Sequence, residues 1–240
     1  MKKPILGGHT NRSFQDENLF IQEKVYTGFN HKINYELLAQ FDFVPKLISN
    51  NEKEIVWDFI NGSIPEMTDE NLIRIANNLK ILHNSKIKFP ASNHAARVKK
   101  YREILKNKNI NLPVLNDYYR QVNMTLAKME KGTPLHNDLW PRNMLVDQNN
   151  HLYILDWEYA TLGDKHFELA YFIEASKLNE AQESLFLNHY EKYNYKFILR
   201  HKILVNYLVI LWAYAQETLP FPVDEYIQKI YELDKELKNY

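Results

Sequence analysis

The spacing of hydrophobic residues changes along the chain and divides it into two parts. Short apolar runs at 19–25, 44–48 and 54–60 predict strands, and the stretch 31–41 predicts a helix. After the Asn61-Gly62 turn, apolar residues recur every three or four positions at 68–82, 97–106 and 115–131, which predicts helices. We therefore expect an α+β fold with a small strand-rich lobe, residues 1–60, and a larger, mostly helical lobe, residues 61–240.

Polar residues mark the beginning of the first long helix. Thr68 is a good N-cap, and Asp69 and Glu70 place negative charge where backbone N–H groups have no partner. The apolar residues that follow at helical spacing are Leu72, Ile75, Ala76, Leu79 and Leu82.

One break in the helical pattern lies between residues 136 and 166. Residues 144–146 and 152–155 are short apolar strands, and Asp147-Gln-Asn-Asn150 is suited to the turn between them because Asn tolerates left-handed backbone. Asp156 follows the second strand, and His136-Asn-Asp138-Leu-Trp-Pro-Arg-Asn143 precedes the first. From residue 167 onward the pattern is helical.

Asp138, Asn143 and Asp156 have the spacing of a phosphoryl-transfer site. Asn143 lies five residues after Asp138, and Asp156 lies eighteen residues after it. Transfer of phosphate from Mg-ATP needs a carboxylate that orients the attacking hydroxyl, together with an amide and a second carboxylate that hold Mg²⁺. We assign these roles to Asp138, Asn143 and Asp156 in that order, and expect His136 to brace the loop. The sequence therefore predicts a kinase with a two-lobed protein-kinase-like fold.

The length of the segment after Asp156 favours a small-molecule acceptor. Protein kinases have a long activation segment there, which forms the platform for a peptide. Here helical character resumes near Phe167, and the chain has neither an Asp-Phe-Gly nor an Ala-Pro-Glu string. A compact site for a small hydroxylated molecule fits this spacing better.

Bulk properties exclude several other classes of function. Lys plus Arg and Asp plus Glu number 30 each, so the net charge gives no footprint for nucleic acid. The chain has no cysteine and hence no disulfide or thiolate metal site. Its longest apolar run, residues 203–215, is shorter than the roughly 20 residues of a membrane span. With no apolar core of a signal peptide at the N-terminus, we expect a cytoplasmic protein without a membrane span.

The catalytic strings resemble one branch of a known kinase family. His136 to Leu145, followed by Ile154-Leu-Asp-Trp-Glu-Tyr-Ala160, resembles the choline kinase branch of the aminoglycoside phosphotransferase-like kinases. The resemblance covers nearly the whole chain. It extends to Gly7-Gly8-His-Thr10-Asn11, Ile60-Asn-Gly62, Leu79-x-x-Leu82-His83 and Trp212, and the catalytic segment is its most specific part.

The resemblance places the phosphates of ATP at the N-terminal turn. Gly7 and Gly8 would let backbone amides approach phosphate oxygens, and Thr10 and Asn11 would add side-chain donors. The backbone of the hinge at Trp57 and Phe59 is expected to meet the adenine ring.

The match to the family is imperfect at the cation on the third strand. The family has a basic residue there, and the matching stretch here is Phe20-Ile-Gln22-Glu-Lys24. Gln22 and Lys24 lie on the same face of a strand, because strand side chains alternate with a period of two. We favour Lys24 over Gln22, with Glu36 on the following helix as its ion-pair partner.

Choline recognition calls for aromatic faces and a carboxylate around a quaternary ammonium that has no N–H group to donate. Trp157 and Glu158 follow the catalytic Asp156, and the resemblance places Tyr207 and Trp212 on a late helix that lines the acceptor pocket. For Trp212, pocket contact and ordinary core packing are both compatible with the sequence, whereas Tyr214 is better explained as core.

The sequence thus predicts an ATP- and Mg²⁺-dependent kinase of choline or a related amino alcohol. Thiamine, ethanolamine or an aminoglycoside are alternative acceptors, although the acidic residues of the C-terminal part show no focus for an aminoglycoside's ammonium groups. A catalytically inactive binding module is the alternative from a different class. One further departure from the family is Glu168-Leu-Ala170, where an Asp is usual, and we expect it to be tolerated.

Overall fold

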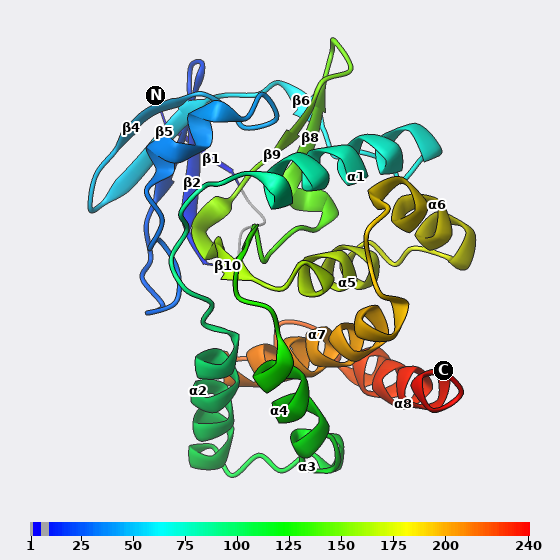
Figure 1. Ribbon diagram of the computed structural model, residues 1–240. Coiled ribbons are helices and arrows are strands. Elements are labelled where there is room, and N and C mark those ends of the chain that lie inside the picture. Colours follow the sequence, from blue (N-terminus) through cyan, green and yellow to red (C-terminus); the bar gives the residue numbers. More distant parts are fainter. Residues whose placement is uncertain (1, 6–9) are drawn as a thin grey trace.

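The N-terminal part of the computed structural model is an antiparallel sheet; the structure describes residues 2–5 and 10–240 (Figure 1). The strand order is β1-β2-β3-β5-β4, so β3 lies in the middle and pairs with β2 and β5. The strands are β1 (Lys3–Ile5), β2 (Arg12–Asp16), β3 (Leu19–Glu23), β4 (Leu47–Asn50) and β5 (Glu54–Asp58).

Two predicted elements of this lobe differ in the structure. The strand expected over 19–25 ends at Glu23, one residue before Lys24. The helix expected over 31–41 is a shorter 3-10 helix, η1 (Tyr35–Gln40), because the Asn34 side chain caps it by accepting from the Glu36 N–H. His31, three residues before Asn34, has a left-handed backbone with φ of 54°, and a continuous right-handed helix cannot contain such a residue.

The larger lobe is helical and has two layers (Figure 1). The layer next to the sheet holds α1, α5, α6 and the short strands of the catalytic hairpin. The layer farther from the sheet holds α2, α3, α4, α7 and α8, with the C-terminus at its far end. The helices are α1 (Asp69–Asn84), α2 (His94–Asn107), α3 (Pro113–Asp117), α4 (Tyr119–Lys128), α5 (Lys165–Ala175), α6 (Glu180–Tyr190), α7 (Tyr195–Ala215) and α8 (Asp224–Lys238).

Five short strands and two 3-10 turns complete the large lobe. Strand β6 pairs with β8 and β8 with β9, while β10 pairs with β7. All three pairings are antiparallel. These elements are β6 (Gly62–Ser63), β7 (Thr133–Leu135), β8 (Met144–Asp147), β9 (Leu152–Ile154), β10 (Thr161–Gly163), η2 (Pro141–Asn143) and η3 (Trp157–Tyr159).

The helix predicted over 115–131 is divided at Tyr118. This residue is buried, and its hydroxyl donates to Asp234 Oδ2 of α8 at 3.1 Å. Its backbone ends α3 and begins α4. The interruption therefore coincides with a hydrogen bond from Tyr118 to a distant helix.

The hydrophobic core has two clusters. One joins the sheet, through residues such as Ile55 and Trp57, to α1 and to the catalytic hairpin. The other surrounds α7 and includes α2, α4 and α8. The two-lobed kinase-like fold predicted from the sequence is confirmed, while the lobe boundary between residues 60 and 61 stays a prediction.

In the described part of the chain, one helix is long and apolar enough to cross a membrane. It is α7, and 72% of its most apolar window is buried inside the protein. It packs against α2, α4, α5 and α8, which is the environment of a core helix.

Candidate active site

The catalytic hairpin fixes the relative positions of Asn143 and Asp156. The Leu155 N–H donates to the Asn143 carbonyl at 2.8 Å, which ties the end of η2 to the end of β9. Asp156 then adopts a left-handed backbone, with φ of 59° and ψ of 60°, and this turns its side chain out of the strand direction. Such a conformation is unfavourable for most residues, and Asp is one of the few that adopt it readily.

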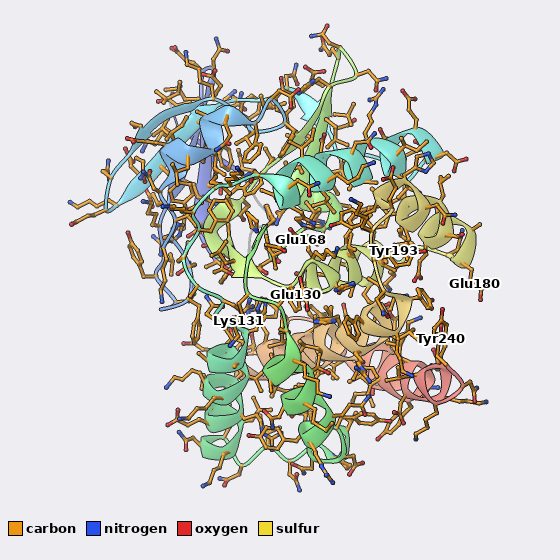
Figure 2. The ribbon with its side chains drawn as sticks, viewed as in Figure 1. Glu130, Lys131, Glu168, Glu180, Tyr193 and Tyr240 are labelled. Atoms are coloured by element: carbon orange, nitrogen blue, oxygen red, sulfur yellow. The ribbon has the colours of Figure 1, made fainter. Side chains whose placement is uncertain are left out.

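Glu168, in the first turn of α5, holds the backbone of the catalytic loop. Glu168 is fully buried and accepts from the backbone N–H groups of His136 at 2.8 Å and Asn137 at 2.7 Å. His83 of α1 contacts the same carboxylate at 3.2 Å. Burial alone would raise the pKa of Glu168, but these hydrogen bonds and the charge of His83 lower it below its usual value. Figure 2 shows Glu168 between α1 and α5, in the interior.

The His136 side chain braces the loop from the other side. Its Nε2 lies 2.7 Å from the Leu155 carbonyl, and its Nδ1 accepts from the Asp138 N–H at 3.2 Å. Its ring packs edge-on against Trp157. These contacts are all within the protein and hold the loop, as expected of a residue that braces it.

Asp138 projects from this loop with both carboxylate oxygens occupied. Oδ1 accepts from the Tyr171 hydroxyl at 2.5 Å, and Oδ2 accepts from Asn143 Nδ2 at 3.0 Å. Loss of solvent raises the pKa of Asp138 to about 6; the Tyr171 hydrogen bond opposes the rise, the charge of Glu158 adds to it and that of Arg97 reduces it. A carboxylate with this pKa is suited to receive a proton from a hydroxyl near neutral pH.

Asn143 and Asp156 offer a set of oxygen atoms that fits Mg²⁺. The Asn143 amide nitrogen is bonded to the Asp138 carbonyl and carboxylate, which leaves its Oδ1 as the atom for a cation. Desolvation and the charges of Glu158 and Asp138 raise the pKa of Asp156 well above its usual value, so a positive charge is favoured here. Mg²⁺ is typically held by one or two carboxylates together with substrate phosphates and waters.

Among the described residues, no three His, Cys, Asp or Glu side chains come together as a metal cluster. Asp156 and Asn143 together offer the carboxylate and amide oxygens that a Mg²⁺ ion shared with phosphates uses.

Glu158 is buried and held by three side chains. Its Oε2 accepts from Asn30 Nδ2 at 2.6 Å, from Asn11 Nδ2 at 2.9 Å and from His31 Nε2 at 3.1 Å. The His31 N–H also donates to the Glu158 carbonyl at 2.8 Å. Asn11 belongs to the predicted phosphate-binding turn, so this network connects that turn to the residues beside Asp156.

The structure corrects the prediction that Lys24 supplies the cation on the third strand. Lys24 Nζ donates to Asn50 Oδ1 and to the Asn51 carbonyl, both at 2.6 Å, in the connection between β4 and β5. Gln22 is the residue that faces the site, and its Nε2 donates to Asp156 Oδ1 at 3.3 Å. Glu36 lies exposed on η1 and is not brought to Lys24. The reason is that β3 ends at Glu23, so the alternation of side chains along the strand does not extend to Lys24.

A cavity of about 810 Å³ lies between the sheet and the helical lobe. Its sheet side includes Thr10, Asn11, Trp57 and Phe59, and Thr10 hydrogen-bonds to Tyr159 at the catalytic side. Phe59 donates its N–H to the Asn18 carbonyl at 2.8 Å, so this group is not free to bind an adenine ring as we expected of the hinge. The predicted Gly8 lies outside the described residues.

The helical side of the cavity is an aromatic wall with one acid. Trp212 of α7 lines the cavity and stacks on Phe221, which in turn packs against Tyr226 of α8. Glu174 of α5 faces the same space and accepts from Asn206 Nδ2 at 2.8 Å. Trp212 thus both lines the cavity and packs against the cluster around α7, and its contact with the acceptor stays a prediction.

The structure corrects the prediction that Tyr207 contacts the acceptor. Tyr207 is fully buried, and its hydroxyl donates to the Leu115 carbonyl at 2.7 Å and accepts from Arg102. It faces away from the cavity because α7 is packed on several sides. Trp157 borders the cavity, but its indole N–H donates to the Ile154 carbonyl at 3.0 Å and its ring lies in the core.

Comparison with known proteins decides the family of this chain. Residues 34–199 match the model of the phosphotransferase enzyme family. The protein LicA homolog of Mycoplasma capricolum is 46% identical over 239 residues, which is all of both chains. This chain belongs to the phosphotransferase enzyme family.

Solved structures show the same fold. The crystal structure of choline kinase LicA from Streptococcus pneumoniae superposes with a TM-score of 0.74 at 21% identity, covering 98% of this chain and 92% of that one. A crystal structure of LicA in complex with AMP gives a TM-score of 0.75 at 20% identity, covering 100% of this chain and 93% of that one.

Several side chains of this phosphotransferase site were missed by the sequence analysis. Tyr171 on Asp138, and Asn30 and His31 on Glu158, come from other elements and carry no local motif. Arg97 of α2 also lines the cavity. Its only sequence signal is that it precedes a basic run, Lys99 to Arg102, whose lysines are exposed.

Proposed function

We propose that this phosphotransferase transfers the γ-phosphate of ATP to the hydroxyl of choline or a closely related amino alcohol. The observation that carries the proposal is the aromatic wall of Trp212, Phe221 and Tyr226 with Glu174, in the same cavity as Asp138. Aromatic faces and a nearby carboxylate attract a quaternary ammonium, which has no N–H group to donate. The LicA of Streptococcus pneumoniae, which shares this fold, is a choline kinase, and the Mycoplasma capricolum relative is a LicA homolog.

The reaction follows from the positions of the carboxylates. The acceptor oxygen forms a bond with the γ-phosphorus, while the bond from that phosphorus to the bridging oxygen breaks and its electron pair stays on ADP. The hydroxyl proton passes to Asp138, and the Tyr171 hydroxyl and the Asn143 amide hold that carboxylate in place. Most of the rate enhancement comes from positioning and from stabilising charge on the transferred group.

The nucleotide is placed by the sheet side of the cavity. Thr10 and Asn11 supply side-chain donors near the phosphates, and Trp57 borders the space for the base. Asp156 and Asn143 would hold Mg²⁺, which would neutralise charge on the phosphates. The structure of LicA in complex with AMP supports a nucleotide as a ligand of this fold. We expect the kinase to act in the cytoplasm, where ATP is available.

Turnover against a panel of acceptors tests the proposal directly. ATP consumption with Mg²⁺ is measured with choline, ethanolamine, thiamine and kanamycin in turn. We expect turnover with choline and lower or no turnover with thiamine and kanamycin, since these are larger and differently charged. Preference for one of the other three would replace the acceptor assignment, and ATP binding without any turnover would favour an inactive binding module.

Replacement of the catalytic carboxylate gives the first test of mechanism. Asp138→Asn keeps the size of the side chain but removes the proton acceptor, so kcat falls about 10³-fold. Asp69→Asn, an exposed acid in the first turn of α1, is the matched control and leaves kcat unchanged. Equal kcat values for Asp138→Asn and the native protein would remove Asp138 from the mechanism.

A further inference from the structure

The main cavity has fewer positive than negative side chains, although it is proposed to receive a triphosphate. The acidic residues that line its described part are Asp58, Asp138, Asp156, Glu158 and Glu174. The cationic side chains in the same lining are Arg97, Arg142 and Lys177. The central strand of the sheet contributes the neutral Gln22 opposite Asp156. Among the described lining residues, a cation that acts beside Mg²⁺ on the transferred phosphoryl group therefore has to come from the helical lobe.

Two of the three cations are poorly placed for this task. Lys177 is exposed and forms an ion pair with Glu225 at 2.7 Å, on the outer rim. Arg142 is exposed, with its guanidinium 5.7 Å from the centre of the Trp140 ring. Charges in such positions are screened by solvent and contribute little.

Arg97 is held inside the protein by aromatic rings. Its guanidinium carbon lies 5.0 Å from the centre of the Tyr159 ring and 6.0 Å from that of Tyr101. Its Nε is buried and has no hydrogen-bond partner among the described residues. A buried N–H without a partner is costly, which points to a ligand that completes its hydrogen bonds.

The charge of Arg97 reaches the catalytic centre. Its positive charge opposes the rise in pKa that burial causes at Asp138 and at Tyr171, two groups that meet at 2.5 Å. Tyr159, whose ring the guanidinium faces, hydrogen-bonds to Thr10 of the predicted phosphate-binding turn. Arg97 thus lines the same cavity as Asp138 and contacts the tyrosine that bonds to this turn.

We propose that Arg97 is a catalytic residue that binds the transferred phosphoryl group from the acceptor side and offsets its charge during transfer. A guanidinium is suited to this because its planar N–H groups match phosphate oxygens. The proposal rests on the proposed kinase activity and adds an orientation for the acceptor. The hydroxyl end lies near Asp138 and Arg97, while the ammonium end lies at Trp212 and Glu174, away from the guanidinium.

Steady-state kinetics give the first test. Arg97→Gln, with ATP and choline varied, lowers kcat by about 10²- to 10³-fold, while the KM of either substrate changes by less than about threefold. Arg97→Lys keeps the charge and recovers about tenfold of that loss, because it lacks the fork of N–H groups. Lys99→Gln removes one exposed charge from the same helix and keeps the native kcat.

A transition-state analogue gives a second readout that does not depend on the acceptor. Calorimetric titration with ADP, Mg²⁺ and aluminium fluoride, without choline, compares the native protein with Arg97→Gln and Arg97→Lys. We expect Arg97→Gln to bind ADP with Mg²⁺ normally but to bind the aluminium fluoride complex at least about tenfold more weakly than the native protein. Equal affinity of the native and Arg97→Gln proteins for that complex would overturn the proposal. Failure of choline turnover would affect the acceptor assignment alone.

Discussion

At the scale of single residues, Gln22 aligns the carboxylate of Asp156 without adding charge. Its Nε2 donates to Asp156 Oδ1 at 3.3 Å from the centre of the sheet. A hydrogen bond of this kind contributes about 1 kcal/mol. Gln22→Ala should therefore lower kcat/KM for ATP by about three- to tenfold. Initial rates at subsaturating ATP measure this change.

Lys24→Gln is the matched control for Gln22→Ala. Lys24 bonds to Asn50 and Asn51 at the edge of the sheet, so its loss should change kcat/KM for ATP by less than about twofold. A larger loss of kcat/KM for ATP in Lys24→Gln than in Gln22→Ala would indicate that Lys24, and not Gln22, acts on the nucleotide.

The residues of the site differ in how far they could be predicted. Asp138, Asn143 and Asp156 lie in one short segment, whose local geometry brings them together. Alternation along a strand leaves the choice between Gln22 and Lys24 open, because the end of the strand decides it. Arg97, Tyr171 and Asn30 reach the site through tertiary packing, which no local pattern encodes.

At the scale of elements, Asp164 joins α5 to the connection between α4 and β7. It is the N-cap of α5 and accepts from the His166 N–H at 2.9 Å and from His166 Nδ1 at 2.7 Å. Its other oxygen accepts from the Glu130 N–H at 3.1 Å. Figure 2 labels Glu130, which lies in the connection between α4 and β7. Asp164 therefore ties the N-terminus of α5 to the segment that leads into β7 and the catalytic loop.

Stability should depend on the ionisation of Asp164 at low pH. Burial alone would raise its pKa, but the bonds to His166 and the charge of His201 lower the pKa to about 2. The contribution to stability is therefore present above about pH 4, where the unfolded side chain is ionised, and is lost as the pH falls through about 2. Asp164→Asn should lower the free energy of unfolding by about 1–2 kcal/mol at pH 7.

Urea denaturation of the native protein and of Asp164→Asn measures this difference. The gap between the two proteins should narrow as the pH falls from 4 to 2, because the native side chain becomes protonated. Asp224→Asn is the control, since Asp224 is exposed in the first turn of α8 and that helix has no side-chain cap. A gap that stays constant over this pH range would show that the charge of Asp164 does not contribute.

The elements themselves were predicted where their signals are local. The cap at Thr68 and the hairpin turn after Asp147 were both found, since side chains near the turn set them. The break at Tyr118 was not, because its anchor is Asp234 of a distant helix. Which face of α7 lines the cavity could not be predicted either. Buried residues occur on most of its faces, so the pattern did not separate Trp212 at the cavity from Tyr207 in the core.

At the scale of the whole molecule, the small lobe shares its core with the large one. Ile55 and Trp57 of the sheet belong to the same buried cluster as Leu79 of α1 and Ile154 of the catalytic hairpin. Tyr195 at the start of α7 packs against this cluster and against the one around α7. Neither lobe can therefore unfold without exposing apolar surface of the other.

We expect the protein to unfold in a single cooperative transition despite its two lobes. Tryptophan fluorescence reports both parts, since Trp57 lies in the shared cluster and Trp212 lies against the one around α7. Far-UV circular dichroism reports mainly the helical lobe. The urea midpoints from the two methods should coincide, and ADP with Mg²⁺ should raise both by the same amount, because a ligand that binds only the folded state stabilises the whole cooperative unit. An earlier fluorescence transition that ADP shifts alone would show that the sheet unfolds as a separate unit.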